Sequence, residues 1–316
     1  MIGLILSYFM YTKIIKKIDL NNQNIMLEAQ INNQNLEWLT VYVHGTTTKL
    51  GLNFLSNFYP EVAYGEPGLH HVNEMPENAL FKKDVETLSL IDSSRFSKEH
   101  FYTFRWSGTL SFKAREIAGK DLYNDLKLLL KDYKKKYGYY PKLRIITFSH
   151  GGNVALNMAS HLPFFEKEHV YLELLIVAAP VQKPTEKYIE KSEIDSIYTI
   201  YSTRDVMQVA DQYILNKRLH SPKRFFKTTR KNCHQIKVLI NKRGLGHLDL
   251  LRSFMVHLPE TLQRVDSFVL GQDCPCIKHI NSGKEAGILE VLIKDDKFCF
   301  YKGYNLISCV YGKRKK

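Results

Sequence analysis

The chain has 316 residues, of which 44% are hydrophobic and 12% aromatic, and a formal net charge of +13 at pH 7. This length and hydrophobic content suit one large α/β domain, and no fixed-period repeat or low-complexity linker divides the chain. A strong positive charge attracts anionic partners such as nucleic acids or phospholipid headgroups. The basic residues are spread widely, however, with no zinc-finger spacing and no RNA-binding aromatic strand, so we expect no nucleic acid as a partner.

The chain begins with an apolar run, MIGLILSYFMYT, followed by the basic sequence KIIKK. The run is shorter than the roughly 20 residues that span a membrane, and it makes a poor signal peptide because no basic residues precede it. We therefore expect residues 1–35 to form an apolar and basic extension. It either packs on the domain or touches anionic headgroups through Lys13, Lys16 and Lys17. Localisation stays open between the cytoplasm and a peripheral membrane site.

Six apolar runs rich in Val, Ile and Tyr follow, separated by helix-length segments. Continuous apolar runs indicate strands that are buried on both faces of a parallel sheet. Between the second and third runs, apolar residues recur every three or four positions from Ala114 to Tyr137, which predicts a helix that ends at Gly138. The alternation predicts an α/β fold with a doubly wound, mostly parallel sheet flanked by helices. The runs are Leu39–Val43, Tyr102–Trp106, Leu143–Phe148, Tyr171–Ala178, Ile197–Tyr201 and Gln235–Ile240.

The third run leads into a candidate nucleophile. Ser149 and His150 follow it directly, and a helix is predicted to start just beyond them. A serine on a tight strand-to-helix turn is the context of a nucleophile elbow, which needs small residues two positions away on each side. Gly151 meets this need, whereas Thr147 stands where glycine is usual. The alternative is that Ser149 only caps the helix, as serines commonly do.

Six motifs occur in a fixed order along the chain: VYVHGTTT, FYTFRWSG, TFSHGGNVAL, VAAPV, YSTRDVMQ and GHLDLLRSF. With them the sequence resembles the α/β-hydrolase superfamily on its lipase-like side, near bacterial lipases and the GPI-inositol-deacylase-like group. The resemblance covers about residues 36–270, which we take as the hydrolase domain. It implies a serine hydrolase that cleaves a carboxylic ester, of a lipid or of a small molecule, through a Ser-His-Asp triad and an acyl-enzyme. It implies no cofactor and no metal.

His247 is the candidate base. A serine hydroxyl is a weak nucleophile until an adjacent base takes its proton. In this fold the triad runs in the order serine, acid, histidine, and His247 follows the last run in a glycine-containing loop. The alternatives His161, His234 and His257 fall within predicted strands or helices.

Asp205 is the candidate acid, because it follows the fifth run and matches the family's acid position. Its rivals are Asp211, six residues further on, and Asp249, which is better placed to cap a helix. By resemblance, the oxyanion hole consists of the backbone amides of Thr46 and His150.

Two inserted segments point to the substrate side. Residues 51–99 are rich in Phe, Tyr, Leu and Pro, and we expect a helix and the rim of an apolar pocket there. Residues 216–231 carry seven Lys and Arg residues around Phe225 and Phe226. Interleaved basic and aromatic residues suit an anionic membrane surface or lipid, and the alternative is a solvated loop.

Residues 271–316 form a predicted C-terminal extension with a basic tail. Two β-rich runs around Asp295 and Asp296 predict a hairpin. Four of the five cysteines lie in this stretch. Their irregular spacing favours reduced thiols in an intracellular protein, with a small disulfide or metal cluster as the alternative.

Other functions fit the same residues. The triad serves any acyl transfer, so amide or thioester hydrolysis is the first alternative. A binding protein that keeps the fold without catalysis is the second.

Overall fold

The computed structural model describes residues 37–47, 59–210, 218–281, 283–285 and 287–295, with the strands Cys299–Lys302 and Asn305–Cys309. The chain divides into two compact units, Met1–Glu37 and Trp38–Lys316, and all of the elements below belong to the second. The extension predicted over residues 1–35 lies outside the described residues.

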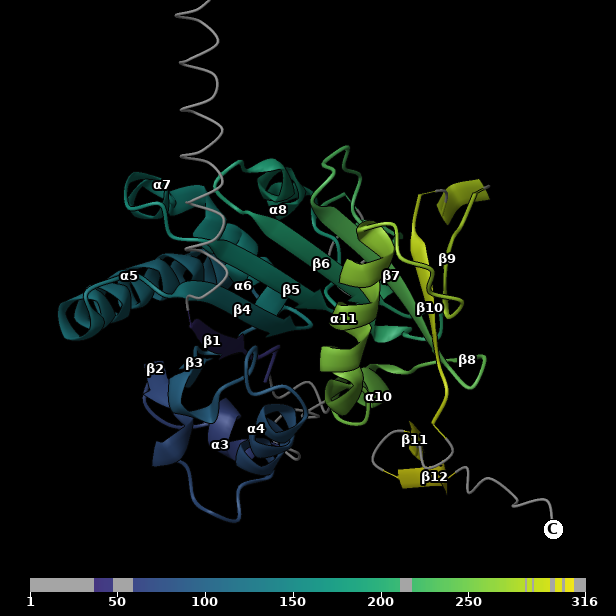
Figure 1. Ribbon diagram of the computed structural model, residues 1–316, viewed down its shortest axis with the longest axis horizontal. Coiled ribbons are helices and arrows are strands. Elements are labelled where there is room, and N and C mark those ends of the chain that lie inside the picture. The colour runs from purple at the N-terminus through teal and green to yellow at the C-terminus, as the bar shows by residue number, and fades with distance from the viewer. Residues whose placement is uncertain are drawn as a thin grey trace, which may run out of the picture. The chain divides into compact units, whose positions relative to one another are not determined.

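The second unit is built around one sheet in the order β2-β3-β1-β4-β5-β6-β7-β10-β9, with β8 paired to β7 (Figure 1). Neighbouring strands from β3 to β10 are parallel, whereas β2, β8 and β9 pair with antiparallel neighbours. β11 and β12 form a separate antiparallel pair. The strands are β1 (Trp38–Val43), β2 (Gly68–His71), β3 (Phe101–Arg105), β4 (Lys142–Phe148), β5 (Leu172–Val177), β6 (Ser196–Tyr201), β7 (Cys233–Ile240), β8 (Arg243–Gly244), β9 (Ile277–His279), β10 (Leu289–Ile293), β11 (Cys299–Lys302) and β12 (Asn305–Cys309).

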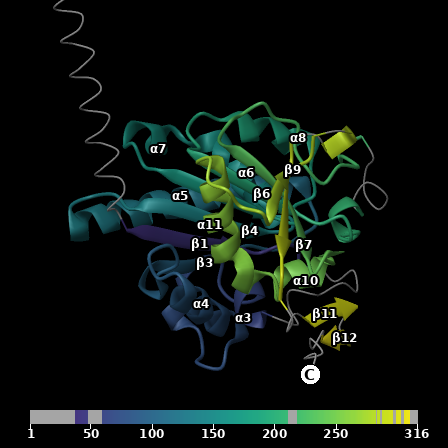
Figure 2. The ribbon, with the colours of Figure 1, turned by 45° about the vertical axis from the view of Figure 1, so that its right-hand side comes forward.

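Helices cover both faces of the sheet, as Figures 1 and 2 show. Helices α5 and α6 pack on one face, and α4, α10 and α11 pack on the other. The doubly wound α/β sheet predicted from the sequence is therefore confirmed, and each of the six apolar runs coincides with a strand. The helices are α3 (Pro60–Ala63), α4 (Leu80–Ile91), α5 (Phe112–Tyr137), α6 (Gly151–Met158), α7 (Pro163–Lys167), α8 (Lys183–Glu186), α10 (His247–Leu251) and α11 (Leu258–Val269).

The strand order has a switch point at β1. From β1 the chain passes to β3 on one side and then crosses to β4 on the other side of β1. The helix predicted from Ala114 makes this crossing as α5, which ends at Gly138 in the left-handed conformation (φ +85°). In open parallel sheets, ligands bind beyond the carboxyl ends of the strands at such a switch point. The segments that follow β1 and β4 therefore flank the expected site.

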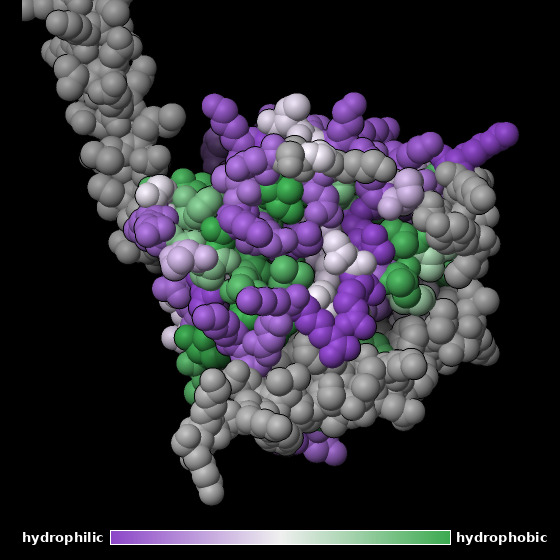
Figure 3. Space-filling view, turned by 90° about the vertical axis from the view of Figure 1, so that its right-hand side faces the viewer, coloured by the Kyte–Doolittle hydropathy of each residue, from purple (hydrophilic) through white to green (hydrophobic). Residues whose placement is uncertain are grey.

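The C-terminal strands differ from the predicted pattern. The run before Asp295 forms β10, which pairs with β7 and β9 and not with β11, so the hairpin predicted around Asp295 and Asp296 is wrong. The hairpin lies one strand further on, between β11 and β12. Leu289, Val291 and Ile293 of β10 are buried, because the strand continues the main sheet beyond the boundary predicted at residue 270. On the face that Figure 3 shows, the described residues are mostly hydrophilic, with hydrophobic patches between them.

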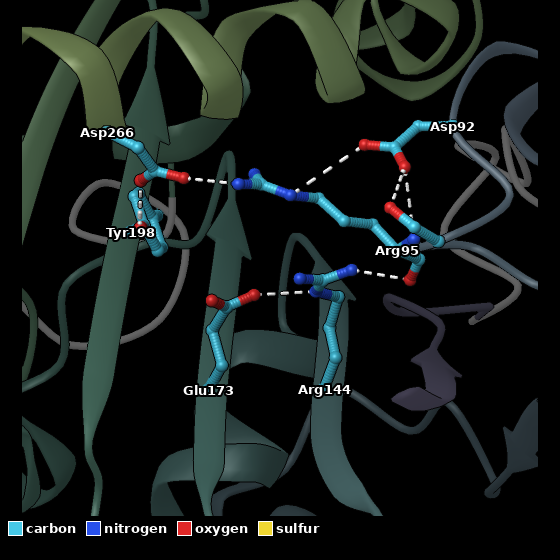
Figure 4. Close-up of polar contacts among 7 residues, drawn as sticks. Asp92, Arg95, Arg144, Glu173, Tyr198 and Asp266 are labelled. Atoms are coloured by element: carbon cyan, nitrogen blue, oxygen red, sulfur yellow. Dashed lines mark hydrogen bonds and ion pairs between the residues drawn. The ribbon is translucent and has the colours of Figure 1, made fainter. Parts of the chain in front are cut away.

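A network of charged side chains crosses the first half of the central strands (Figure 4). Arg144 on β4 and Glu173 on β5 are opposite each other in register and form a buried ion pair, with Arg144 Nε 2.5 Å from Glu173 Oε1. Arg144 also donates to the carbonyl oxygen of Arg95, whose own guanidinium binds Asp266 of α11. Tyr198 of β6 donates its hydroxyl proton to the same carboxylate. The network ties α11 and the segment after α4 to the sheet.

Candidate active site

Ser149 stands on a sharp turn between β4 and α6. Its φ of +54° lies in the left-handed region, which a residue with a side chain rarely adopts. The turn is held by bonds on both sides: Ser149 N donates to Val177 O at 2.9 Å, and Gly152 N donates to Ser149 O at 3.0 Å. Strained backbone of this kind concentrates at functional sites. The local geometry is that of a nucleophile elbow.

Close approaches explain the small residues around the turn. A Cβ at position 151 would lie 2.3 Å from Val43 O, so only glycine fits there. A Cβ on Gly45 would lie 2.9 Å from the Cβ of Ser149, which brings the segment after β1 against the serine. Thr147, where the sequence departs from the usual glycine, is fully buried and donates its hydroxyl to Leu175 O at 3.3 Å. The larger threonine side chain therefore fits at this position because its hydroxyl binds the neighbouring strand β5.

Asp205 and His247, 42 residues apart in sequence, form a pair in which the carboxylate is buried and the imidazole ring is partly exposed. His247 Nδ1 lies 2.8 Å from Asp205 Oδ2, and the carboxylate is fully buried. Its second oxygen, Oδ1, accepts from the backbone N of Gln208 at 3.1 Å. The ring of His247 packs on the ring of Phe148, with centroids 4.6 Å apart, so the histidine lies beside the residue that precedes Ser149.

The rival residues have other partners. Asp249 Oδ2 accepts from Gly246 N at 2.8 Å, so this carboxylate caps α10, as the sequence suggested. His257 Nε2 lies 2.9 Å from Asp295 Oδ2, and His234 lies on β7 against Tyr198. Asp211 is outside the described residues.

The segment after β1 is held by a buried histidine that the sequence did not single out. His44 Nδ1 donates to Gly45 O at 2.7 Å, and His44 Nε2 accepts from Trp106 N at 3.1 Å. The indole Nε1 of Trp106 donates back to His44 O at 2.9 Å, and the two rings stack. Burial lowers the pKa of His44 to about 4, with a smaller contribution from the charge of Arg105, so the ring is neutral near pH 7. A buried Trp needs a partner for its N–H, and that need is the signal in the sequence for this contact.

Thr46 and His150, the predicted oxyanion donors, lie on the segments that follow β1 and β4. Thr47 N donates to Gly108 O at 3.0 Å, which fixes the backbone just after Thr46. The buried Thr46 Oγ1 has no hydrogen-bond partner among the described residues. His150 is buried at the start of α6. The role of the two backbone amides as oxyanion donors stays a prediction.

Residues 216–231 are called the basic insert below. The described part of this insert, from residue 218, packs against the domain more closely than the sequence suggested. Phe226 is buried, with its backbone N 2.7 Å from Gln235 Oε1 and its carbonyl oxygen 2.9 Å from Gln235 Nε2. Arg230 donates to the backbone carbonyls of Ile189 and Ile194. Because Phe226 is buried and Arg230 binds backbone carbonyls, the alternative of a solvated loop is wrong for the part of this insert that the structure describes. Lys217 is outside the described residues.

A cavity of about 520 Å³ lies next to the segment after β3. Residues 51–58 of the predicted apolar rim are outside the described residues, and only Pro67 and Gly68 of that segment line this cavity. Its other walls mix apolar, neutral polar and charged side chains: Phe104, Arg105, Trp106, Ser107, Ala114, Ile117, Ala118, Asp121, Asn124 and Asp125.

Within the described ranges, no group of three His, Cys, Asp or Glu side chains is arranged to hold a metal ion. No helix in the part of the chain that the structure describes is long and apolar enough to cross a membrane.

No protein-family model matches the chain, and no curated protein matches it. Among solved structures, an esterase from Pyrococcus furiosus is similar at 14% identity, with a TM-score of 0.36, over 73% of this chain and 82% of that one. An esterase from Pyrobaculum calidifontis is similar at 10% identity and a TM-score of 0.31, over 82% of this chain and 67% of that one. An acylaminoacyl peptidase from Pyrococcus horikoshii is similar at 11% identity and a TM-score of 0.35, and this chain covers 38% of its length.

The fold and the elbow together define the structural class. A mostly parallel, doubly wound sheet carries a strained serine turn between a central strand and the helix that follows it. These features are those of the α/β-hydrolase fold.

Proposed function

We propose that the protein is a serine hydrolase that cleaves a carboxylic ester, with Ser149 as nucleophile, His247 as general base and Asp205 as the acid. The observation that carries the proposal is the 2.8 Å contact between His247 Nδ1 and the buried Asp205 carboxylate, beside the left-handed turn at Ser149. A carboxylate buried away from water needs a compensating partner, and an imidazole N–H supplies one.

The hydrogen bond to Asp205 fixes the tautomer of His247. With its Nδ1 proton donated to the carboxylate, the ring has Nε2 free of a proton and able to accept one from the Ser149 hydroxyl. Ser149 Oγ then attacks the ester carbonyl carbon, and the amides of Thr46 and His150 donate to the oxyanion that develops. His247 returns its proton to the leaving alcohol, which leaves an acyl-enzyme. Water repeats the sequence and releases the acid.

The neutral His44 supports this chemistry from outside the triad. Its two ring bonds tie the Gly45 carbonyl to the backbone of Trp106, so the turn that carries Thr46 is fixed before the substrate arrives. Donors that are already in place need no reorganisation when the oxyanion forms.

We propose an ester as the substrate, of a lipid or of a small molecule, on the lipase-like side of the fold. Amide and thioester cleavage would use the same groups. A binding protein without catalysis has no need of a serine, a histidine and an aspartate in triad positions. The non-catalytic alternative therefore has less support.

The proposal is tested by measuring turnover of p-nitrophenyl esters with acyl chains of two to sixteen carbons. A matched anilide and a thioester are measured in the same assay. We expect ester hydrolysis by the wild type and a loss of at least about a thousandfold in Ser149→Ala, since triad removal costs several orders of magnitude. Preference for long chains would support a lipid substrate, and preference for short chains a small ester. Equal turnover by wild type and Ser149→Ala would overturn the proposal.

A further inference from the structure

The segment between Asp205 and β7 pairs with the loop that follows β5. Gln182 and His220 form an antiparallel bridge, and the residues around them extend it. Lys183 N donates to Leu219 O at 3.0 Å, and Ser221 N donates to Val181 O at 2.9 Å. Residues 218–226, here called the 218–226 segment, are therefore fastened by backbone bonds beside the catalytic edge.

Within this pairing, the side chain of Gln182 connects two buried histidines. Gln182 Nε2 lies 3.4 Å from His150 Nδ1 and 3.3 Å from His220 Nε2. Gln182 is fully buried, and both histidines are less than a tenth exposed. An amide nitrogen carries two hydrogens, so it can donate one to each ring. His150 directly follows Ser149 and supplies one of the proposed oxyanion donors.

The 218–226 segment also contacts Asp205, the proposed acid of the triad. Arg224 Nε donates to the backbone carbonyl oxygen of Asp205 at 3.1 Å. The buried Gln208 donates through Nε2 to Arg224 O at 3.0 Å and to Ala179 O at 2.8 Å. The backbone of Arg224 is thereby tied to the loop after β5, and its side chain holds the turn that carries the carboxylate.

We propose that the 218–226 segment and the loop after β5 with which it pairs form a positioning element of the active site. Gln182, from the loop after β5, orients His150 on the nucleophile side, and Arg224, from the 218–226 segment, orients Asp205 on the acid side. The inference rests on the proposed function, because it assigns a role toward that same triad. The ring of His150, held by Gln182, restricts the backbone at the residue whose amide faces the oxyanion. The effect belongs in the transition state, where a misplacement of about 1 Å can cost about a hundredfold.

The test compares two side-chain hydrogen bonds, one beside the proposed triad and one in the charged network at the other half of the strands. Gln182→Met keeps the length of the side chain and removes its polar atoms. Tyr198→Phe is the matched control, because it removes a hydrogen bond to Asp266 in the network at the opposite half of the strands. We expect both variants to lose some thermal stability, so activity is measured well below the lower melting temperature.

We expect Gln182→Met to lower kcat by about tenfold to a hundredfold with little change in KM, and Tyr198→Phe to leave both near wild type. A trifluoromethyl ketone adds to the serine and places an oxyanion in the hole, so its Ki should rise in parallel with the loss of kcat/KM. A merely structural role would lower the amount of folded enzyme without moving this Ki.

Arg224→Gln tests the positioning of Asp205 by the same kcat and Ki measurements. It remains informative if Gln182→Met does not fold. Its control is Lys120→Gln, an exposed residue of α5 outside the 218–226 segment, and this variant should leave kcat unchanged. Wild-type kcat and Ki in both Gln182→Met and Arg224→Gln, with the wild type active, would overturn the positioning role. Failure of the proposed function is a separate result, since the wild type itself would then show no turnover.

Discussion

Among single residues, His44 combines complete burial with a titratable ring. Its folded-state pKa is about 4, below the ordinary value of 6.5, because burial disfavours the charged ring. As the pH falls from about 6.5 to 4, the unfolded chain takes up a proton at this position and the folded chain does not. The free energy of unfolding therefore falls over this window, by about 3 kcal/mol from this group.

Urea unfolding at several pH values between 7 and 4 measures this contribution. His44→Gln has no titrating ring and can still accept from Trp106 N, so we expect a smaller slope of stability against pH over this window. The variant should also be less stable than the wild type at pH 7. Identical slopes in the two proteins would show that His44 is not the group responsible.

Asp205 and Asp249 allow a direct comparison of two carboxylates in the same region. Asp205→Asn removes the charge that holds the tautomer of His247, and we expect kcat to fall by about 10⁴. Asp249→Asn keeps a side-chain oxygen that accepts from Gly246 N, so its kcat should stay within a few-fold of wild type. Steady-state ester hydrolysis by both variants decides the assignment, and the reverse pattern would make Asp249 the acid.

At the scale of elements, the pair between β4 and β5 is the clearest stability determinant. Arg144 and Glu173 are buried on adjacent strands, so removal of one partner leaves a buried charge. We expect Arg144→Met to lower the free energy of unfolding by about 3–5 kcal/mol. The double variant Arg144→Met with Glu173→Leu should recover most of this loss, because neither charge remains. Chemical denaturation of the two variants gives both values, and a double variant no more stable than the single one would contradict this account.

The central strands could be predicted because burial on both faces produces continuous apolar runs. The elbow could be predicted as well, since Ser149, Gly151 and the start of α6 are close together in sequence. Long-range pairing left no such local signal. The parallel pairing of β10 with β7 and the bridge between Gln182 and His220 join residues far apart in the chain, so neither was expected.

The same limit applies to the candidate site. The sequence named His247 and Asp205 through family order and predicted the capping role of Asp249. It did not predict that His44 pairs with Trp106, or that Gln208 and Arg224 surround Asp205. These contacts depend on which loops meet beyond the carboxyl edge of the sheet, and that follows only from the complete strand order.

For the whole molecule, the charge of +13 bears on its partners. We propose that anionic membrane surfaces attract it through exposed lysines of the basic insert, although Phe226 is buried. Lys223, Lys227 and Lys231 are exposed, and each contributes about 1 kcal/mol near an anionic surface. Wild type should sediment with phosphatidylserine vesicles at low salt, and less so near physiological salt. The variant in which these three lysines are changed to Gln should sediment less than the wild type. Equal sedimentation of the two proteins would show that the basic insert does not bind the membrane surface.

The central claim is that Ser149 is an activated nucleophile. A fluorophosphonate probe reacts with serine hydroxyls that an adjacent base has activated, so intact-mass spectrometry after labelling tests the claim directly. We predict one phosphonyl group per wild-type chain, located on the peptide that contains Ser149, and none on Ser149→Ala. His247→Ala should label far more slowly, because the hydroxyl keeps its proton. An unlabelled wild type, or equal labelling of Ser149→Ala, would contradict the account.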